Sequence, residues 1–344
     1  MKNIIVMFAL IAFAACDNSV GDEPEPIIGF PVTDFVNING LAQFWDGDPK
    51  QVEITVKEEK GISGVITVYY NGALAPPARP GRYTVTFDID AQGSSQKEIA
   101  AGILIITLCT DDDTVLRTQL PYCPINTINN PIPVKLDIDL SRYVTFINIL
   151  ARTNRYLEVD LSDSIGTTIT GQPFSNSDYS KIVSVILPTG LTNIEDFGLA
   201  CFSGLVNVVL PVNLNTLGDY AMSNCENLNS VTISAGLTKL GDYVFFNCAN
   251  LVNVTIPDTV ISVGAWAFVN CTGLTSIKIG KNVAFIGRQA FHDTGLTSVT
   301  FTGIIENFEG SIFTFPGDLQ EKYLEGGPGT YTRHDVNSET WEKL

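Results

Sequence analysis

Basic residues are scarce in this sequence: 20 Lys and Arg stand against 37 Asp and Glu, giving a formal net charge of −17. Nucleic-acid binding needs clustered Lys and Arg to neutralise phosphates, and docking on anionic lipid needs the same charge. The charge balance therefore argues against both kinds of partner. Charged residues are nevertheless only 17% of the chain and hydrophobic residues 45%. This composition excludes a disordered acidic chain and predicts a large ordered core.

Residue patterns that support catalysis are also lacking. The two histidines, His292 and His334, lie near no nucleophile motif, and Gly-x-Ser-x-Gly, P-loop and dinucleotide-binding patterns are absent. The adjacent Glu195 and Asp196 fit a solvated acidic surface better than acid–base catalysis. Residues 111–113 are three consecutive Asp without the alternating ligands and central glycine of an EF-hand. The sequence thus predicts a protein that is not an enzyme, with no catalytic residues, no cofactor and no metal site.

One long apolar run occurs, from Ile4 to Ala15, preceded by Lys2 and followed by Cys16. It is too short to span a bilayer and is typical of a secretory signal. Small residues directly before a cysteine resemble a bacterial lipoprotein signal, residues 1–15, which implies that Cys16 becomes the lipidated first residue of the mature chain. Ordinary secretion, with Cys16 discarded or unmodified, is the alternative. Asp17 leaves the choice between inner and outer membrane open.

Residues 16–29 are acidic and proline-containing and predict a flexible tether. Residues 30–108 instead alternate apolar and polar side chains, as in 52–56 and 83–89, between turn residues such as Asn71-Gly72 and Pro80-Gly81. This pattern predicts a small antiparallel β domain. The stretch 68–87 resembles the β modules of bacterial surface adhesins, of either the immunoglobulin-like or the β-grasp type. That resemblance implies a spacer; the alternative is that the module binds a ligand itself.

The polar, proline-punctuated segment 109–133 is expected to be a linker. It contains Cys109 and Cys123, which would lie in an oxidising compartment. A disulfide between them would close a loop of about 15 residues and contribute roughly 3 kcal/mol. The sequence leaves the bonded and the unbonded thiols equally open.

A repeat dominates the rest of the chain. Apolar residues that start each unit recur at intervals of 23 residues, the last interval being 22: Ile182, Leu205, Leu228, Leu251, Leu274 and Leu296. The fullest copy contains Leu251, Val254, Ile256, Pro257, Val260, Val263, Gly264, Ala267, Phe268 and Cys271. Such a period is typical of a solenoid, in which each unit buries its apolar face against its neighbours. The pattern resembles the BspA-like leucine-rich repeats of bacterial surface proteins. The predicted fold is therefore multidomain: a small all-β module, then a leucine-rich repeat solenoid over 134–344 with parallel strands and short helical turns.

Several columns of the repeat suggest specific roles. Ala267, Phe268 and Cys271 have helical spacing, and the Gly264 column is expected to make a tight bend. The thiols of Cys225, Cys248 and Cys271 are a full unit apart, which favours buried packing over zinc binding. The aromatic column Phe197, Tyr220, Tyr243 and Trp266 is expected to stack on itself rather than to grip sugar rings. Beyond the repeats, Asp318 is predicted to cap a helix over 319–325, followed by a hairpin of 330–333 and 340–343 that closes the stack.

Strand residues that point away from the core form the expected binding face, because they are small, mostly neutral and nearly flat. The candidate partner-binding residues are Ser184, Asn207, Val209, Ser230, Thr232, Asn253, Thr255, Ser276, Lys278 and Thr300. The lipoprotein resemblance implies a lipid anchor, and the protein is expected at the outer membrane, exposed on the surface. The repeat resemblance implies attachment through a protein or glycan surface of a host matrix or of other bacteria. The alternative is a periplasm-facing envelope scaffold with no host ligand.

Overall fold

The computed structural model describes residues 36–39, 42–44, 49, 51–56, 64–70, 73–77, 81–91, 94–110, 116–117, 120, 123, 126–171, 179–309 and 314–344. The predicted signal, Cys16 and the predicted tether lie outside these residues. The chain divides into two compact units: one extends to Leu108 and includes 122–124, and the other comprises 109–121 and 125–344. Neither unit, as far as it is described, contains a helix long and apolar enough to cross a membrane.

The described residues of the first unit include six β-strands, and the small β domain itself stays a prediction. Strand β1 (Val36–Asn39) pairs with β3 (Glu53–Val56), and β4 (Gly64–Tyr70), β5 (Gly81–Ala91) and β6 (Ser94–Thr110) pair in order, all antiparallel. The short β2 (Ala42–Phe44) adds to β6 in parallel. Tyr70 is buried, and its hydroxyl accepts a hydrogen bond of 2.8 Å from the Val52 amide. The choice between the immunoglobulin-like and β-grasp types stays a prediction.

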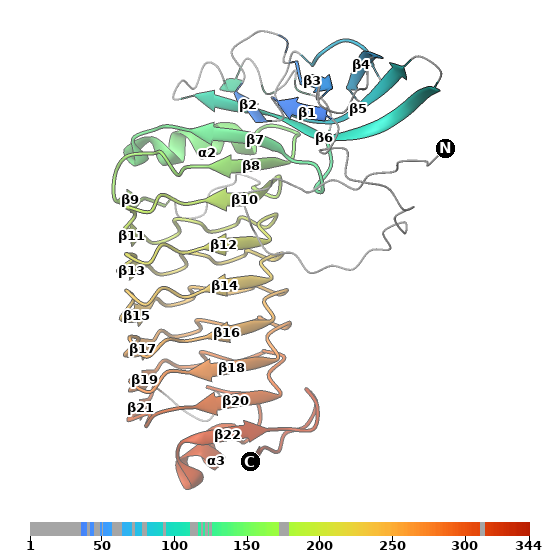
Figure 1. Cartoon of the computed structure of the whole chain (residues 1–344). Helices are drawn as coiled ribbons and strands as arrows, with labels where there is room; N and C mark the ends of the chain where they lie inside the picture. Colours follow the sequence, from blue (N-terminus) through green and yellow to red (C-terminus); the bar gives the residue numbers. More distant parts are fainter. Residues whose placement is uncertain are drawn as a thin grey trace. The chain divides into compact units, whose positions relative to one another are not determined.

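The second unit contains a stack of parallel strands, one for each coil (Figure 1). In chain order they are β7 (Ile132–Leu136), β8 (Leu157–Asp160), β10 (Ile182–Ile186), β12 (Asn207–Val209), β14 (Ser230–Thr232), β16 (Asn253–Thr255), β18 (Ser276–Ile279) and β20 (Ser298–Phe301). Each pairs in parallel with the strand of the next coil. The 23-residue period of the sequence is therefore the length of one coil.

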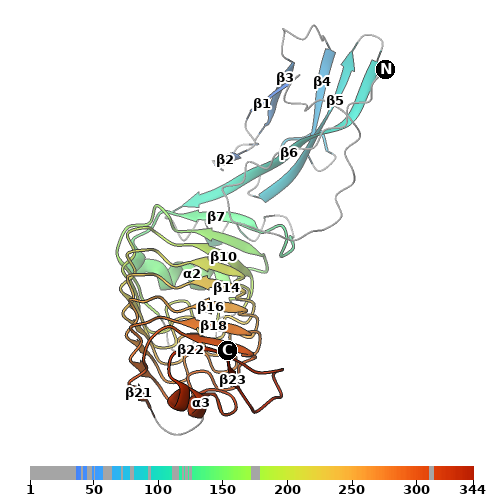
Figure 2. The ribbon, with the colours of Figure 1, turned by 60° about the horizontal axis from the view of Figure 1, so that its bottom comes forward.

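A second series of two-residue strands runs along another edge of the coils (Figures 1 and 2). These strands are β9 (Thr168–Ile169), β11 (Asn193–Ile194), β13 (Thr216–Leu217), β15 (Lys239–Leu240), β17 (Ser262–Val263), β19 (Phe285–Ile286) and β21 (Asn307–Phe308). In each, the second residue belongs to the apolar column of Val263, and Ile194, Leu217, Leu240, Val263 and Ile286 are all buried. The apolar column of Val263 thus lies in a strand that the sequence pattern did not reveal.

The predicted short helical turns are wrong, because the segment of each coil that carries Ala, Phe and Cys is made of consecutive turns. In one coil, Tyr220 and Asn224 have positive φ angles, both 57°, which a helix does not accommodate. Ala221 and Ser223 donate hydrogen bonds within their own turn, whereas Tyr220, Met222 and Asn224 donate to the next coil over 2.8 to 3.0 Å. Successive backbone amides therefore alternate between hydrogen bonds within a coil and hydrogen bonds to the next coil. The apolar side chains that are spaced three and four residues apart still point inward.

The glycine column has a different cause from the expected tight bend. No positive φ occurs at Gly264; instead, a Cβ there would lie 2.6 Å from both the Gly241 carbonyl carbon and the Asp242 nitrogen of the preceding coil. Side chains are excluded because two backbones stack directly at this edge. The interior beside it is filled by matching columns, including the stacked rings of Phe245, Phe268 and Phe291, whose successive centroids are 5.2 Å apart.

The first coil is closed by elements that the sequence pattern did not predict. A 3₁₀ turn, η4 (Leu140–Arg142), leads into helix α2 (Tyr143–Ala151), whose Phe146 and Leu150 are fully buried. The pairing of β8 with β10 is irregular at its start: Leu157 lies opposite Ile182, and the register shifts before Ser184. A polar linker was expected over 109–133, but Leu116 and Leu120 are buried there.

The C-terminal cap follows the prediction except at one bond. Helix α3 (Leu319–Gly326) precedes the antiparallel pair β22 (Gly329–Thr332) and β23 (Glu342–Lys343), and β22 adds antiparallel to β20. The Asp318 side chain does not cap α3; its carboxylate accepts a 2.8 Å hydrogen bond from the Trp341 amide. Asp318 therefore ties the hairpin to the helix start rather than capping the helix.

Candidate binding face of the solenoid

The outward side chains of the parallel strands form two continuous columns, which together we call the strand face. The strand register places Ser184, Asn207, Ser230, Asn253, Ser276 and Ser298 in the first column. The second column contains Val209, Thr232, Thr255, Lys278 and Thr300. Residues between the columns, such as Val208 and Val254, point inward and are buried. All ten predicted candidates therefore lie on one surface.

Exposure along the strand face is uneven. Val209 is 75% exposed, and seven candidates in all are exposed: Asn207, Val209, Ser230, Thr232, Asn253, Thr255 and Lys278. Ser184, Ser276 and Thr300 are half-buried. The strands at the centre of the solenoid consequently present the most accessible part of the face.

Polar side chains of the first column bond to one another. Ser230 Oγ donates to Asn207 Oδ1 over 2.8 Å, and Ser276 Oγ donates to Asn253 Oδ1 over 2.6 Å. Each bond joins neighbouring coils and holds both side chains in place. The face is therefore a preorganised row of hydroxyl and amide groups, which lowers the side-chain entropy that a bound partner would have to remove.

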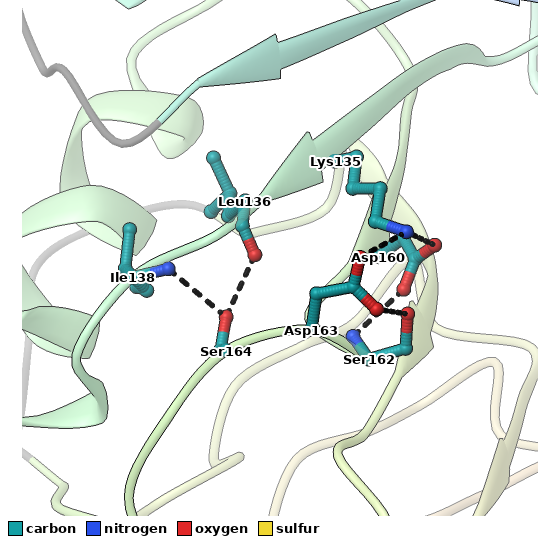
Figure 3. Close-up of polar contacts among 7 residues, drawn as sticks. All are labelled: Lys135, Leu136, Ile138, Asp160, Ser162, Asp163 and Ser164. Carbon is teal, nitrogen blue, oxygen red and sulfur yellow. Dashed lines mark hydrogen bonds and ion pairs between the residues drawn. The ribbon is translucent and has the colours of Figure 1, made fainter.

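Charged residues mark the beginning of the strand face (Figure 3). In the strand register, Lys135 of β7 lies opposite Asp160 of β8, and Asp160 lies opposite Ile186 of β10. Asp160 therefore occupies the position before Ile186 in the second column. The Lys135 Nζ lies 2.7 Å from Asp163 Oδ2 and 4.0 Å from Asp160 Oδ2. The hydrogen bond from Lys135 lowers the pKa of Asp163. A charged cluster thus borders the neutral centre on this side, and Lys278 is the charged residue on the other.

Neighbouring contacts in Figure 3 hold the first coil together. Ser164 Oγ donates to the Leu136 carbonyl over 2.7 Å and accepts from the Ile138 amide at 3.3 Å. The Ser162 amide donates to Asp160 Oδ1 over 2.8 Å. These bonds join the β7 coil to the loop after β8 and explain why polar Ser164 is buried.

Members of the strand face at both of its ends were not predicted from the sequence. Ile186 is 44% exposed and lies opposite Val209 when the β10–β12 register is continued by two residues. Its place 23 residues before Val209 was a signal in the sequence. Thr330 and Thr332 extend the columns from the antiparallel β22, opposite Thr300 and Ser298. Their position depends on how the cap folds back, so no repeat pattern indicated it.

The repeat matches a known family. The model described as the BspA type leucine rich repeat region matches in six copies, over residues 148–256 and 192–320, which together cover half of the chain. The chain belongs to this family. No curated protein sequence matches it.

Three solved structures to which parts of this chain are similar are leucine-rich repeat proteins. One from Bacteroides ovatus is 21% identical over 48% of this chain and 41% of its own, with a TM-score of 0.39. The leucine-rich repeat protein of T. pallidum is also 21% identical, over 49% of this chain and 83% of its own, with a TM-score of 0.40. A leucine-rich cell surface protein from Faecalibacterium prausnitzii is 21% identical over 43% of this chain and 38% of its own, with a TM-score of 0.32. This chain thus spans about two fifths of the length of the first and third of these proteins.

The cysteine column of the BspA-type repeats is a packing column. Cys225, Cys248 and Cys271 are fully buried, and each thiol donates to a carbonyl of the preceding coil over 3.0 to 3.3 Å. Burial raises the pKa of Cys271 to about 12. Protonated thiols that already donate hydrogen bonds are poor nucleophiles and poor metal ligands. No cluster of three metal-ligating side chains occurs within the described part of the chain.

The aromatic column stacks as expected. The rings of Phe197 and Tyr220 are 4.9 Å apart and 8° from parallel, and those of Tyr220 and Tyr243 are 4.4 Å apart at 8°. Trp266 ends the stack edge-on to Tyr243 at 4.6 Å, and Arg288 lies 4.7 Å over its ring. These half-buried rings mainly bind one another, which supports the packing interpretation.

Aspartates beside this column have a structural role as well. Asp196 Oδ1 accepts from the Asp219 amide, Asp219 Oδ1 from the Asp242 amide, and Asp242 Oδ1 from the Ala265 amide, over 2.8, 2.8 and 2.9 Å. Each carboxylate thus satisfies a backbone amide of the next coil. Asp196, which was predicted to belong to a solvated acidic surface, is exposed and is also part of this hydrogen-bonded ladder.

A predicted disulfide and a predicted lipidation site stay untested. Cys123 is buried, but the side chain of Cys109 in β6 is outside the described side chains, so their disulfide stays a prediction. Cys16 lies outside the described residues, so its lipidation stays a prediction too.

Proposed function

We propose that this protein is a lipid-anchored cell-surface attachment protein that binds the surface of another protein or a glycan through its strand face. It acts by binding, without a catalytic step or a cofactor. The observation that carries the proposal is the strand face itself: two continuous columns of small, exposed, mostly neutral side chains on a rigid stack. Such extended surfaces are what solenoid repeats offer to partners.

The size of the face defines what a partner must contact. Five steps of about 4.8 Å give the columns a length of roughly 24 Å, and two outward positions on each strand give a width of about 7 Å. That is roughly 170 Å², well below the approximately 800 Å² that each partner buries in a stable protein interface. We therefore expect the contact to extend over the segments after the strands, where Val212 is 79% exposed.

The proposed anchoring at the outer membrane surface is inferred from the amino-acid sequence alone. The order of Lys2, an apolar run, small residues and Cys16 supports lipidation of Cys16. The first unit would then act as the spacer between the membrane and the solenoid. Protease treatment of intact cells tests surface exposure: cleavage of the solenoid supports the attachment function, and protection until the outer membrane is opened supports a periplasmic scaffold instead.

Partner binding is tested with full-length variants on cells and on a surface coated with host matrix. The test variant introduces glutamate at four exposed positions of the strand face: Val209→Glu, Thr232→Glu, Thr255→Glu and Lys278→Glu. The matched control changes the net charge equally at exposed positions in, or directly before, β13 and β15 of the second strand series: Asn215→Glu, Thr216→Glu, Thr238→Glu and Lys239→Glu. We expect both variants to stay folded and only the strand-face variant to lose attachment. Equal attachment of the two variants would contradict the proposal.

A further inference from the structure

Three exposed aliphatic side chains interrupt the polar surface where the strand face begins. Val209 is 75% exposed, Val212 79% and Ile186 44%. Ile186 lies opposite Val209 when the β10–β12 register is continued. Val212 follows Val209 by three residues, which keeps their backbones within about 10 Å of each other. We call these three residues the apolar patch.

The repeat itself does not require apolar residues at these positions. In the coil that follows, Thr232 takes the place of Val209 and Ala235 that of Val212. Both are exposed, so neither position contributes to the core of its coil. Aliphatic side chains that gather on the surface, where the next coil carries a polar and a small residue, indicate a contact surface for a partner.

Carboxylates border the apolar patch on the side of the first coil (Figure 3). Asp160 lies opposite Ile186, and Asp163 follows β8 at the same distance as Val212 follows β12. Both carboxylates pair with the ammonium group of Lys135, and their side chains stay 28% and 59% exposed. Two carboxylates against one ammonium leave negative charge in excess beside the patch. A partner that has positive charge next to its apolar side chains is therefore attracted.

Aliphatic groups favour a protein partner over a glycan at this place. Packing of aliphatic side chains against one another removes apolar surface from water, and each side chain that is fully buried contributes roughly ten- to a hundredfold in affinity. Sugar hydroxyls placed on the same methyl groups would lose hydrogen bonds to water without replacement. A second copy of the chain is disfavoured as well, because each copy has a net charge of −17.

We propose that the apolar patch is the anchor point for a protein partner in which aliphatic side chains lie beside Lys or Arg residues. The partner's aliphatic side chains pack on Val209 and Val212, and its basic side chains pair with Asp160 and Asp163. This inference rests on the proposed attachment function and specifies the chemistry of the partner: a protein segment rather than a glycan.

The first experiment measures the binding of short synthetic peptides to the full-length protein by fluorescence polarisation. The test peptide has a central run of valine and leucine with lysines on both sides. One comparison peptide has glutamates in place of the lysines, and the other has serines in place of the aliphatic residues. We expect the test peptide to bind most tightly. No binding of the test peptide, or binding no tighter than that of either comparison peptide, would overturn the proposal.

Substitutions copied from a neighbouring coil test the patch without disturbing the fold. The test variant combines Val209→Thr with Val212→Ala, which copies the residues of the next coil. The control is Ile261→Thr, which copies Thr238 of the preceding coil at an isoleucine that is 54% exposed directly before β17. We expect the test variant to bind the valine–leucine–lysine peptide about tenfold more weakly and the control to bind as the wild type does. Unchanged binding by the test variant, or an equal loss in the control, would contradict the assignment.

A charge variant tests the acidic border. Asp160→Asn with Asp163→Asn removes two carboxylates and keeps their acceptor oxygens. Glu306→Gln with Glu325→Gln is the control, since it removes two exposed carboxylates elsewhere on the solenoid. We expect several-fold weaker binding of the peptide by the first pair at low salt, with a smaller difference at high salt, and no change in the control. Equal binding by both pairs would exclude the proposed ionic contacts.

Attachment to a surface coated with reconstituted basement-membrane matrix connects the patch to the proposed function. Trypsin, which cleaves proteins after Lys and Arg, should remove the partner from this surface, whereas periodate oxidation of glycans should leave attachment unchanged; the reverse would favour a glycan and overturn this proposal. The variant with four glutamates on the strand face separates the two possible failures. If it loses attachment while Val209→Thr with Val212→Ala keeps it, the attachment function stands and the patch is not its anchor. If neither variant loses attachment, both proposals are wrong.

Discussion

Replacing Gly264 by alanine tests how closely the coils stack. The new Cβ would lie 2.5 Å from Asp242 Oδ1 and 2.6 Å from backbone atoms of Gly241 and Asp242. Ordinary carbon contacts need about 3.5 Å, so the two coils must separate by about 1 Å at this edge. The 2.9 Å hydrogen bond from the Gly264 amide to the Leu240 carbonyl would then weaken or break.

The expected loss of stability follows from these two effects. Overpacking costs about 1–3 kcal/mol, and one or two weakened hydrogen bonds add about 1 kcal/mol each. We therefore expect Gly264→Ala to lower the free energy of unfolding by about 3 kcal/mol, a large fraction of the 5–15 kcal/mol typical of domains. Urea unfolding, followed by tryptophan fluorescence and by far-ultraviolet circular dichroism, measures the change as a lower midpoint with an unchanged slope.

Gly190 supplies the matched control, because a Cβ there meets no atom within 4 Å and its φ is not positive. Gly190→Ala should change the free energy of unfolding by less than about 1 kcal/mol in either direction. If Gly264→Ala were no more destabilising than Gly190→Ala, the coils would not need glycine for their close approach. The account of this column would then be wrong.

Three further predictions concern single bonds and one buried thiol. Asp242→Ala removes the acceptor of the Ala265 amide and should cost about 1 kcal/mol in urea unfolding, whereas Asp242→Asn, which keeps an acceptor oxygen, should restore most of it. Asp318→Ala should destabilise the cap by about 1 kcal/mol, with faster hydrogen exchange at the Trp341 amide; unchanged exchange would argue against that bond. The pKa of Cys271 is raised from 9.0 to about 12, so this thiol stabilises the fold below pH 9 and loses its contribution as the pH rises towards 12. Stability should therefore fall less steeply with pH above 9 in Cys271→Ala than in the wild type; parallel curves would show that the thiol does not titrate in this way.

Much of the solenoid follows directly from the repeat. Inward columns recur every 23 residues because each coil must bury the same positions against its neighbours, so period and chemistry together predict strand direction, strand register and the outward residues. The burial of Cys248 and the stacking of Tyr220 were predictable for the same reason. Ile186 lies one period before Val209, so the repeat would also have predicted its place on the strand face.

Other features depend on contacts between coils, which no single segment encodes. The spacing of Ala267, Phe268 and Cys271 suits a helix as well as it suits consecutive turns; the turns prevail because alternate amides bond to the next coil, an interaction absent from an isolated peptide. Gly264 is required by the backbone beside it and not by its own φ.

The two ends of the solenoid were decided by tertiary structure alone. Asp318 has a helix-capping sequence but bonds to Trp341, 23 residues later, because the hairpin folds back beside it. Helix α2 belongs to no repeat, and only the tertiary structure buries its Phe146 and Leu150. A periodic sequence determines what repeats, whereas its end caps arise where the repeat meets residues that do not belong to it.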